Sequence, residues 1–231
     1  MINKLLQHFN EFGRLNTFLY FLHRICSKTN LLHAGLIKYY IYFQPTYNGI
    51  PISRPQNIDI SIITKESPLI HNFPRPSHVI ERRYTADNIC FGAYNEKEFV
   101  GFLWLAEDFY EEDEVRCNYH LRPIGKLCWD YDVYIDPKYR SGFAFAKLWS
   151  TAGQYMKEHR KLGTMSRVSV YNSKSIRSHE RLGAVRLGTQ TFFVMGILQI
   201  MASSMPPYLH ISVTRSSRVQ VTLHLPDTFH D

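Results

Sequence analysis

The N-terminal part of the chain carries the spacing of apolar residues that is typical of helices. Over residues 4–28 they recur at steps of three and four, at Leu5, Phe9, Phe12, Leu15, Leu19, Leu22 and Cys26. One side of a helix collects residues at this spacing, so the pattern predicts an amphipathic helix. A second helical stretch is predicted over residues 31–43, ending just before Pro45.

A connector follows at residues 45–55, where prolines and a glycine interrupt any regular pattern. Such composition is common in the linkers between domains. We therefore expect an N-terminal amphipathic helical appendage at residues 1–55 and a main domain at residues 56–231.

The main domain begins with patterns that are typical of strands. Apolar residues alternate over residues 58–63, which predicts a strand, whereas the prolines within residues 66–84 predict broken helix and loop. The segments 88–94 and 99–106 have the composition of strands and flank a four-residue polar turn. Together they predict a hairpin.

The second half of the main domain alternates between strand and helix. Strands are predicted over residues 127–136, 165–171, 191–201 and 209–225, and helices over residues 142–162 and 173–182. Gly183 follows the second of these helices, where a glycine commonly forms the C-cap. An antiparallel hairpin followed by the order β-α-β-α-β predicts an α/β fold with a mixed sheet flanked by helices.

The composition predicts a folded protein without a membrane span. Of the 231 residues, 45% are hydrophobic and 14% aromatic, which excludes a disordered chain. The longest uncharged apolar stretch, residues 191–205, is too short and too often interrupted by polar residues to cross a bilayer. The first residues lead into no uninterrupted apolar run of the kind that a secretory signal has. We therefore expect a cytoplasmic protein.

The cysteines give no sign of a metal site or of a disulfide framework. They are Cys26, Cys90, Cys117 and Cys128, with neither a C-x-x-C pair nor the mixed His and Cys spacing of a metal site. We expect reduced, mostly buried thiols and no metal.

The net charge of +7 is distributed unevenly along the chain. Residues 138–186 hold eleven basic side chains, opposed only by Glu158 and Glu180, whereas residues 107–114 are strongly acidic. A basic half favours a phosphate-bearing partner, and a solvated charged face is the alternative. No helix-turn-helix, zinc finger or aromatic RNA-binding signature accompanies the charge, so we do not expect a nucleic acid partner.

A candidate phosphate site lies where the predicted strand 127–136 gives way to the next helix. The corner reads Asp136-Pro-Lys-Tyr-Arg-Ser-Gly-Phe-Ala144. A helix that begins without an obstructing side chain offers unpaired backbone N–H groups and the positive end of its dipole to an anion. Small residues at Gly142 and Ala144 permit close approach, and the Arg140 guanidinium can add a bidentate contact. A plain tight turn is the alternative.

Three linked elements resemble the GNAT superfamily of acyl-CoA-dependent N-acyltransferases. They are the corner after Val133-Tyr-Ile135, the strand that ends at Asn172, and the helix with Ser175 and His179-Glu-Arg-Leu-Gly-Ala184. The resemblance covers roughly residues 88–201 and implies a GNAT-like, mostly antiparallel sheet. It also implies that acetyl-CoA or a longer acyl-CoA is the co-substrate, bound with the help of Asn172 and Ser175. For Asn172, the alternative is an ordinary helix N-cap.

The resemblance assigns the rest of the CoA site to the corner and the strand before it. The pyrophosphate is expected on the backbone amides of Arg140, Ser141, Gly142, Phe143 and Ala144, and Tyr139 is expected to complete this part of the CoA site. Val133, Tyr134 and Ile135 are expected to bind the pantetheine arm as an added strand would. The glycines of the family motif align either with Phe143 and Phe145 or with the smaller Gly142 and Ala144. We prefer the second alignment, because close approach requires small residues.

Three residues are candidates for the chemistry. His179 stands where many relatives have a tyrosine that protonates the leaving thiolate, and a surface histidine beside Glu180 is the alternative. Alternation places Asp130, Asp132, Tyr134 and Asp136 on one face of their strand. Asp132 is the first candidate for the base that deprotonates the amine, with Asp130 next. The alternative is that these carboxylates bind arginine or backbone N–H groups.

The sequence thus predicts an N-acyltransferase that joins an acyl group to a primary amine of a small molecule or lipid precursor in a ternary complex. The alternatives are a long-chain N-acyltransferase at a membrane surface and a CoA-binding module without catalysis. The predicted N-terminal helix suits peripheral contact with the inner membrane, a cover over an acyl chain, or packing on its own domain. A homodimer is left open.

Overall fold

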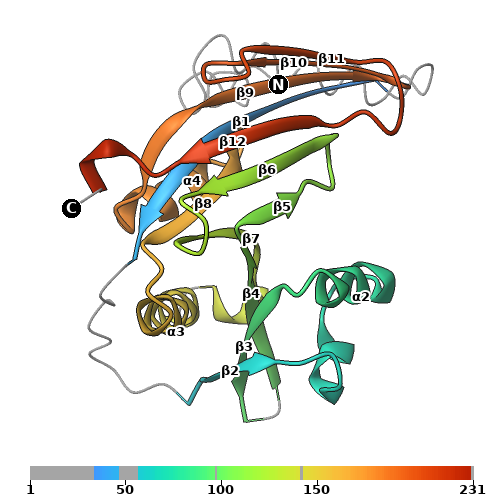
Figure 1. Ribbon diagram of the computed structural model, residues 1–231. Helices are drawn as coiled ribbons and strands as arrows, with labels where there is room; N and C mark the ends of the chain where they lie inside the picture. The colour runs from blue at the N-terminus through green and yellow to red at the C-terminus, as the bar shows by residue number, and fades with distance from the viewer. Residues whose placement is uncertain (1–33, 47–56, 97, 141–142, 230–231) are drawn as a thin grey trace, which may run out of the picture. The chain divides into compact units, whose positions relative to one another are not determined.

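A computed structural model describes the chain over residues 34–46, 57–96, 98–140 and 143–229 (Figure 1). The helix predicted over residues 4–28 lies outside these described residues, as does most of the predicted connector. The chain divides into two compact units. The first consists of Met1–Gln44, Tyr110–His120 and Met165–Asp231, and the second of Pro45–Phe109 and Leu121–Thr164.

The second unit is built on an antiparallel sheet. Its strands lie in the order β7 (Leu127–Ile135), β4 (Glu98–Glu107), β3 (Ile89–Asn95) and β2 (Asp59–Ile63). β3 and β4 form the predicted hairpin, in which Asn95 lies opposite Glu98. The predictions for all four strands are confirmed.

Helices cover both faces of this sheet. Ile80 of α2 (Ser77–Thr85) packs with Phe102 and Trp104 on one face. Tyr155 of α3 (Ala144–Glu158) meets the ring of Phe91 at 5.5 Å between centroids. Phe91 pairs with Leu103, the neighbour of Trp104, and successive side chains of a strand point to opposite faces, so α3 covers the other face. A short 3-10 helix, η1 (Pro68–Asn72), precedes α2, which confirms the predicted broken helix.

The first unit contains a larger sheet and a smaller one. The larger has the order β11 (Leu209–Ser212), β10 (Leu198–Ser203), β9 (Val185–Met195), β1 (Ala34–Pro45) and β8 (Gly163–Ser169), and α4 (Ser173–Arg181) follows β8. The smaller has the order β12 (Val219–His224), β6 (Cys117–Arg122) and β5 (Phe109–Glu111). The Tyr119 hydroxyl of the smaller sheet donates a hydrogen bond to Gln190 Oε1 of the larger at 2.6 Å. One face of the larger sheet is therefore packed against the smaller sheet.

The prediction of a helix over residues 31–43 is wrong, because Ala34–Pro45 is the strand β1. The segment is rich in isoleucine and tyrosine, which favour strands. It pairs with β9 from Ala34 opposite Met195 to Phe43 opposite Val185. Pairing and burial along this length outweigh the local helical spacing, which is a weak signal in a short segment. Whether residues 1–33 form a separate appendage stays a prediction.

The C-terminal strands were also predicted too coarsely. Residues 191–201 span parts of two strands, since β9 and β10 turn at Gly196, whose φ is +58°. Residues 209–225 likewise hold β11 and β12, which belong to different sheets. The short strands β5 and β6 were not predicted. Part of β5 lies in the acidic stretch that resembles a loop in sequence, yet Glu112 within that stretch is 1% exposed and pairs with Arg167.

The fold class and the burial of three cysteines agree with the predictions. The structure is a mixed α/β fold with mostly antiparallel strands and flanking helices, as predicted. Cys90, Cys117 and Cys128 are buried free thiols. Among the helices of the described ranges, none combines the length and the apolar character that a membrane crossing needs.

Candidate functional site

Strand β7 contains a bulge at the positions predicted to carry the chemistry. Phe102 and Trp104 of β4 pair with Tyr134 and Tyr131, so three residue steps of β7 match two of β4. Asp132, within the bulge, has a φ of +46°, in the left-handed region that non-glycine residues rarely occupy.

The bulge changes which side chains share a face. Tyr131 and Tyr134 project to the same face as their partners, and so the prediction that Asp130, Asp132, Tyr134 and Asp136 share a face is wrong. Strict alternation requires an uninterrupted ladder, and the extra residue shifts the phase. Asp130 is 3% exposed and pairs in the ladder with Leu105.

Two arginines hold the Asp132 carboxylate. Arg75 Nε donates to Asp132 Oδ2 at 2.9 Å and Arg75 Nη2 donates to Oδ1, while Arg83 Nη1 donates to Oδ2 at 2.6 Å. Charge-assisted and bidentate hydrogen bonds of this kind are the strong ones in proteins. This geometry agrees with the structural alternative for Asp132, in which the carboxylate binds arginine.

The same arginines lie over the aromatic residues on both sides of the bulge. The Arg75 guanidinium carbon is 5.5 Å and 5.4 Å from the ring centroids of Phe102 and Tyr134. That of Arg83 is 5.2 Å from the ring of Trp104 and 5.1 Å from that of Tyr131. The face of an aromatic ring attracts a cation, so the rings orient the two guanidinium groups toward Asp132. The region of α2 thereby fixes the backbone of β7.

The corner after β7 is partly described. Asp136 caps the 3-10 helix η2 (Pro137–Tyr139) by accepting from Lys138 N at 2.9 Å. Arg140 Nε donates to the Ile135 carbonyl at 2.9 Å. α3 then begins at Ala144, and its N-cap residue Phe143 makes no side-chain capping hydrogen bond. An uncapped start leaves the first N–H groups of a helix available to a ligand.

Ser141 and Gly142 lie outside the described residues, so the phosphate contacts predicted for this corner stay predictions. The same holds for the pantetheine contacts predicted for Val133, Tyr134 and Ile135.

α4 of the first unit contains the other predicted residues. Asn172 is the N-cap, and its Oδ1 accepts from Ser175 N at 3.1 Å. Gly183, at φ +82°, ends the helix as predicted, and Ala184 N donates to the His179 carbonyl. A contact of Asn172 or Ser175 with CoA stays a prediction.

His179 is the only buried residue among those of α4, at 7% exposed. Its ring stacks on that of Tyr42, with centroids 5.9 Å apart and planes 14° apart. The alternative of a surface histidine is therefore wrong. Burial lowers the pKa of His179 to about 4, so the imidazole is neutral at pH 7. Tyr171 precedes α4 in the sequence, and burial raises the pKa of its phenol to about 12. The phenol is therefore protonated at pH 7.

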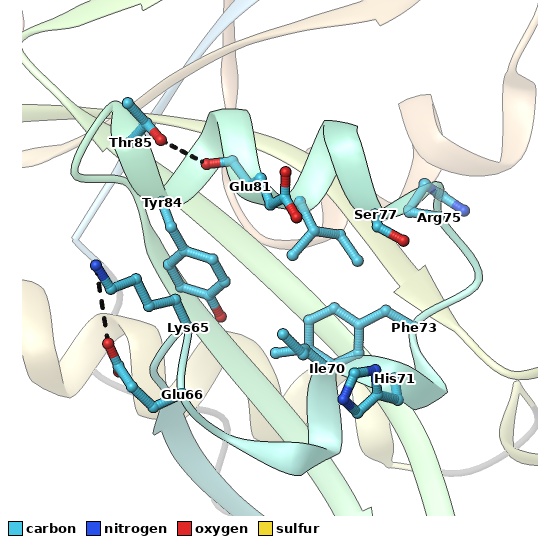
Figure 2. A pocket seen from close by; sticks show the side chains of 11 residues that line it. Lys65, Glu66, Ile70, His71, Phe73, Arg75, Ser77, Glu81, Tyr84 and Thr85 are labelled. Carbon is cyan, nitrogen blue, oxygen red and sulfur yellow. Dashed lines mark hydrogen bonds and ion pairs between the residues drawn. The ribbon is translucent and has the colours of Figure 1, made fainter.

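The second unit also holds a cavity of about 530 Å³ that the sequence did not indicate (Figure 2). It is lined by Lys65, Glu66, Ile70, His71, Phe73, Arg75, Ser77, Ile80, Glu81, Tyr84 and Thr85. Apolar and aromatic residues form part of the lining, and the charged side chains are the carboxylates of Glu66 and Glu81 and the cations Lys65 and Arg75. Glu66 pairs with Lys65 at 3.8 Å, and the Tyr84 hydroxyl donates to the Ile63 carbonyl at 2.8 Å. No motif marks these residues, because the cavity results from how η1 and α2 pack.

Arg75 connects this cavity to the bulge, because its side chain lines the cavity and binds Asp132 of the bulge. In the described ranges, no group of three or more histidine, cysteine, aspartate or glutamate residues is arranged to hold a metal ion.

Comparison with known proteins identifies the family. The model of the acetyltransferase (GNAT) family matches residues 60–184, which is more than half of the chain. The chain belongs to the GNAT acetyltransferase family. The family match includes the bulge, the corner and α4 of this GNAT protein. No curated protein matches the sequence.

Solved structures with a similar fold are distant in sequence. A conserved protein of unknown function from Staphylococcus epidermidis is 13% identical, with a TM-score of 0.50, over 77% of this chain and 66% of that one. A putative GNAT acetyltransferase from Novosphingobium aromaticivorans is 16% identical, with a TM-score of 0.47, over 70% and 65%. A tandem GNAT protein from the clavulanic acid biosynthesis pathway is 11% identical, with a TM-score of 0.48, over 79% and 58%. Our chain thus spans less than two thirds of the length of each of these three proteins, and the likeness concerns the fold.

Proposed function

We propose that the protein is an acyltransferase that moves an acetyl or longer acyl group from acyl-CoA to a primary amine. Membership of the GNAT family supports the reaction type. The observation that carries the proposal is the bulge of β7, which Arg75 and Arg83 fix and which ends at Tyr134, ten residues before α3 starts uncapped at Ala144. A bulge turns backbone N–H groups out of the ladder, where they can bind an acyl carbonyl.

The reaction follows from this arrangement as a direct transfer. The neutral amine attacks the thioester carbon, and a backbone N–H near Val133 or Tyr134 stabilises the oxyanion. Collapse of the tetrahedral intermediate re-forms the carbonyl and expels the CoA thiolate, which then takes up a proton. The substrate ammonium has to lose one proton before attack and the amide nitrogen another after it.

We infer that Asp132 positions the bulge and is not the base. Three guanidinium N–H groups bind its carboxylate oxygens, so the carboxylate is held by Arg75 and Arg83. Asp130, the second candidate, is buried at 3% exposed in the sheet. We assign removal of the ammonium proton to water.

The proton that neutralises the thiolate is also reassigned. At pH 7 only about one His179 side chain in a thousand is protonated if the pKa is about 4. We infer that His179 packs against Tyr42 and supports α4. The proton then comes from water or from another side chain, such as the protonated Tyr171 phenol.

We propose that the acceptor is an amine with an apolar body, which the cavity of Figure 2 receives. Phe73, Ile80 and Tyr84 offer apolar contacts, and the Glu81 carboxylate can attract a cation, whereas a neutral acyl chain gains nothing from it. The volume of about 530 Å³ is that of a small-molecule site.

The transferase proposal is tested with purified protein, acetyl-CoA, longer acyl-CoAs and a panel of primary amines. We expect release of free CoA thiol that depends on the amine, and formation of the corresponding amide by mass spectrometry. CoA binding by calorimetry without amine-dependent thiol release identifies a binding module instead. A requirement for both vesicles and long-chain acyl-CoA identifies the membrane-surface alternative.

The cavity assignment is tested with Ile70→Trp, which fills part of the space, and with Glu81→Gln. Both changes are expected to raise KM for amines with a bulky apolar body by about tenfold, with little effect on small amines. The control is Glu158→Gln on α3, which covers the opposite face of the sheet. If Ile70→Trp instead changes the preferred length of the acyl-CoA chain, the cavity holds the acyl group.

A further inference from the structure

The larger sheet of the first unit has two faces that differ in how they are covered. The register of β1, β9, β10 and β11 assigns every residue to one face or the other. The first face is buried, with Gln190, Phe192, Gln199, Met201 and Ser212 each at most 1% exposed. The smaller sheet contacts this face, since Arg116 N donates to Gln199 Oε1 at 2.8 Å and Tyr119 bonds Gln190. Figure 1 shows β12 and β6 beside β1 and β9.

The second face, here called the open face, is mostly apolar, with Lys38 opposite Thr191 as a polar pair and Thr189 beyond it. It carries Leu36, Phe193, Met195, Leu198, Ile200, Leu209 and Ile211. None of these side chains is buried, and Leu209 and Ile211 are 62% and 55% exposed. Val213, two residues beyond Ile211, is 62% exposed. A contiguous apolar surface on a sheet normally has a partner, because its exposure to water is unfavourable.

We propose that the open face is the docking surface for this chain's own residues 4–28. The first argument is the path of the chain. Those residues run into β1, whose first residue, Ala34, pairs with Met195 of the open face. The five intervening residues, 29–33, can span about 17 Å when extended. That reach is enough to bring residues 4–28 back over the strands.

The second argument is the match of pattern and size. The apolar residues at positions 5, 9, 12, 15, 19 and 22 need an apolar partner if the segment forms the helix that its spacing predicts. A helix of 25 residues is about 37 Å long, and the four strands from β1 to β11 lie across about 15 Å. One such helix can therefore cross the whole open face. Burying its stripe and the face together removes both from water.

The third argument concerns competing partners. A segment tied to β1 by five residues has an effective concentration of about a millimolar or more at the face. A second copy of the chain or a membrane has to compete with it at far lower concentration. The tether therefore favours the intramolecular partner.

Limited trypsin cleavage of the full chain tests the proposal. Docking protects the bonds after Arg14 and Arg24, and the rate of cleavage follows the population of the undocked state. Ile211→Asp, at a side chain that is already 55% exposed, is expected to speed this cleavage about tenfold. Ile62→Asp, at a 50% exposed residue of β2 in the second unit, is the matched control and is expected to change nothing.

A substitution within residues 4–28 completes a double-mutant cycle with Ile211→Asp. Phe12→Asp is expected to speed cleavage as much as Ile211→Asp does, and the double variant little more than either, because both remove one contact. Near-ultraviolet circular dichroism shows whether each variant keeps its fold, and Leu209→Asp replaces Ile211→Asp if that variant does not.

Three outcomes overturn the proposal. Equal cleavage rates in the wild type and in a folded open-face variant show that residues 4–28 do not dock there. A dimer that Ile211→Asp converts to a monomer, with unchanged cleavage, assigns the face to a second copy. Binding to anionic vesicles that the same variant abolishes, again with unchanged cleavage, assigns it to a membrane.

Discussion

Asp132 shows how one side chain can decide the geometry of a strand. Its backbone occupies the left-handed region, which costs free energy for any residue with a side chain, and its carboxylate binds two arginines. The ion pairs offset the backbone strain and so keep the bulge in place. The residue that seemed the best base in sequence is therefore better explained as a structural anchor.

Replacement of Asp132 by asparagine separates these two roles. We expect Asp132→Asn to lower the free energy of unfolding by about 1–3 kcal/mol, because the two guanidinium groups lose their counter-charge. The rate is expected to fall by a similar factor at every pH, without a change in the shape of the pH profile. The measurements are urea denaturation and kcat against pH, with Arg82→Lys on α2 as the control. Loss of one limb of the pH profile would show that Asp132 is the base after all.

His179 predicts a pH dependence of stability. Its pKa is lowered from 6.5 to about 4 in the folded state, so the unfolded chain binds more protons between these values. The contribution of neutral His179 to the free energy of unfolding is therefore present above pH 6.5. It is lost as the pH falls toward 4, by roughly 3 kcal/mol in total.

The check is His179→Phe, which keeps a ring against Tyr42 and removes the titration. The difference in unfolding free energy between wild type and variant should shift in favour of the variant as the pH falls from 7 to 4. His78→Phe, at an exposed histidine of α2, should show no such shift. If His179 has to be protonated to serve as the donor, kcat should instead fall tenfold for each pH unit above 4.

At the scale of elements, the pairing of β4 with β7 depends on close backbone approach. A Cβ at Gly101 would lie 2.3 Å from the Tyr134 carbonyl oxygen and 2.9 Å from Ile135 Cδ1. The first of these atoms belongs to the backbone of β7, directly after the bulge. The two strands can pair there only because position 101 has no side chain.

Gly101→Ala should therefore strain the bulge. We expect a loss of about 1–3 kcal/mol in unfolding free energy and weaker CoA binding, because β7 has to move. Gly35→Ala on β1, where an added Cβ meets nothing within 4 Å, is the matched control. The measurements are urea denaturation and calorimetry with CoA. Equal stability of the two variants would contradict the close approach.

At the scale of the whole molecule, the described part of the chain before residue 56 contributes the strand β1 to the fold. Tyr39, Ile41 and Phe43 of β1 are at most 1% exposed, and β1 lies between β9 and β8. The sequence had predicted an N-terminal appendage that ends at residue 55. The described part of that region, from Ala34, is instead an interior strand of the first unit.

Two truncations test this conclusion. A protein that begins at residue 56 is expected to be insoluble or unfolded in its first unit, because removal of β1 exposes both neighbouring strands and the residues packed on them. A protein that begins at Ala34 is expected to fold, with the open face uncovered and a greater tendency to associate. Circular dichroism and size-exclusion chromatography distinguish these outcomes. A folded, monomeric protein from residue 56 would show that β1 is dispensable.

The sequence by itself determined the elements whose signals are local. The hairpin of β3 and β4, the strand β7, the helix α3 and the C-cap Gly183 all follow from alternation, helical spacing or a positive φ at glycine, and each depends on neighbours along the chain. The resemblance to the GNAT superfamily rested on the same local stretches, and the family match over residues 60–184 confirmed it.

The tertiary structure decided what depends on residues far apart in sequence. β1 is a strand because it pairs with β9, some 150 residues later in the chain. No local sequence pattern indicates this pairing. Asp132 is clamped because Arg75 and Arg83 reach it from another element, and His179 is neutral because Tyr42 and its other neighbours exclude water. Burial and pairing are properties of the assembled fold, and they set the charge and the role of a side chain that sequence can only name.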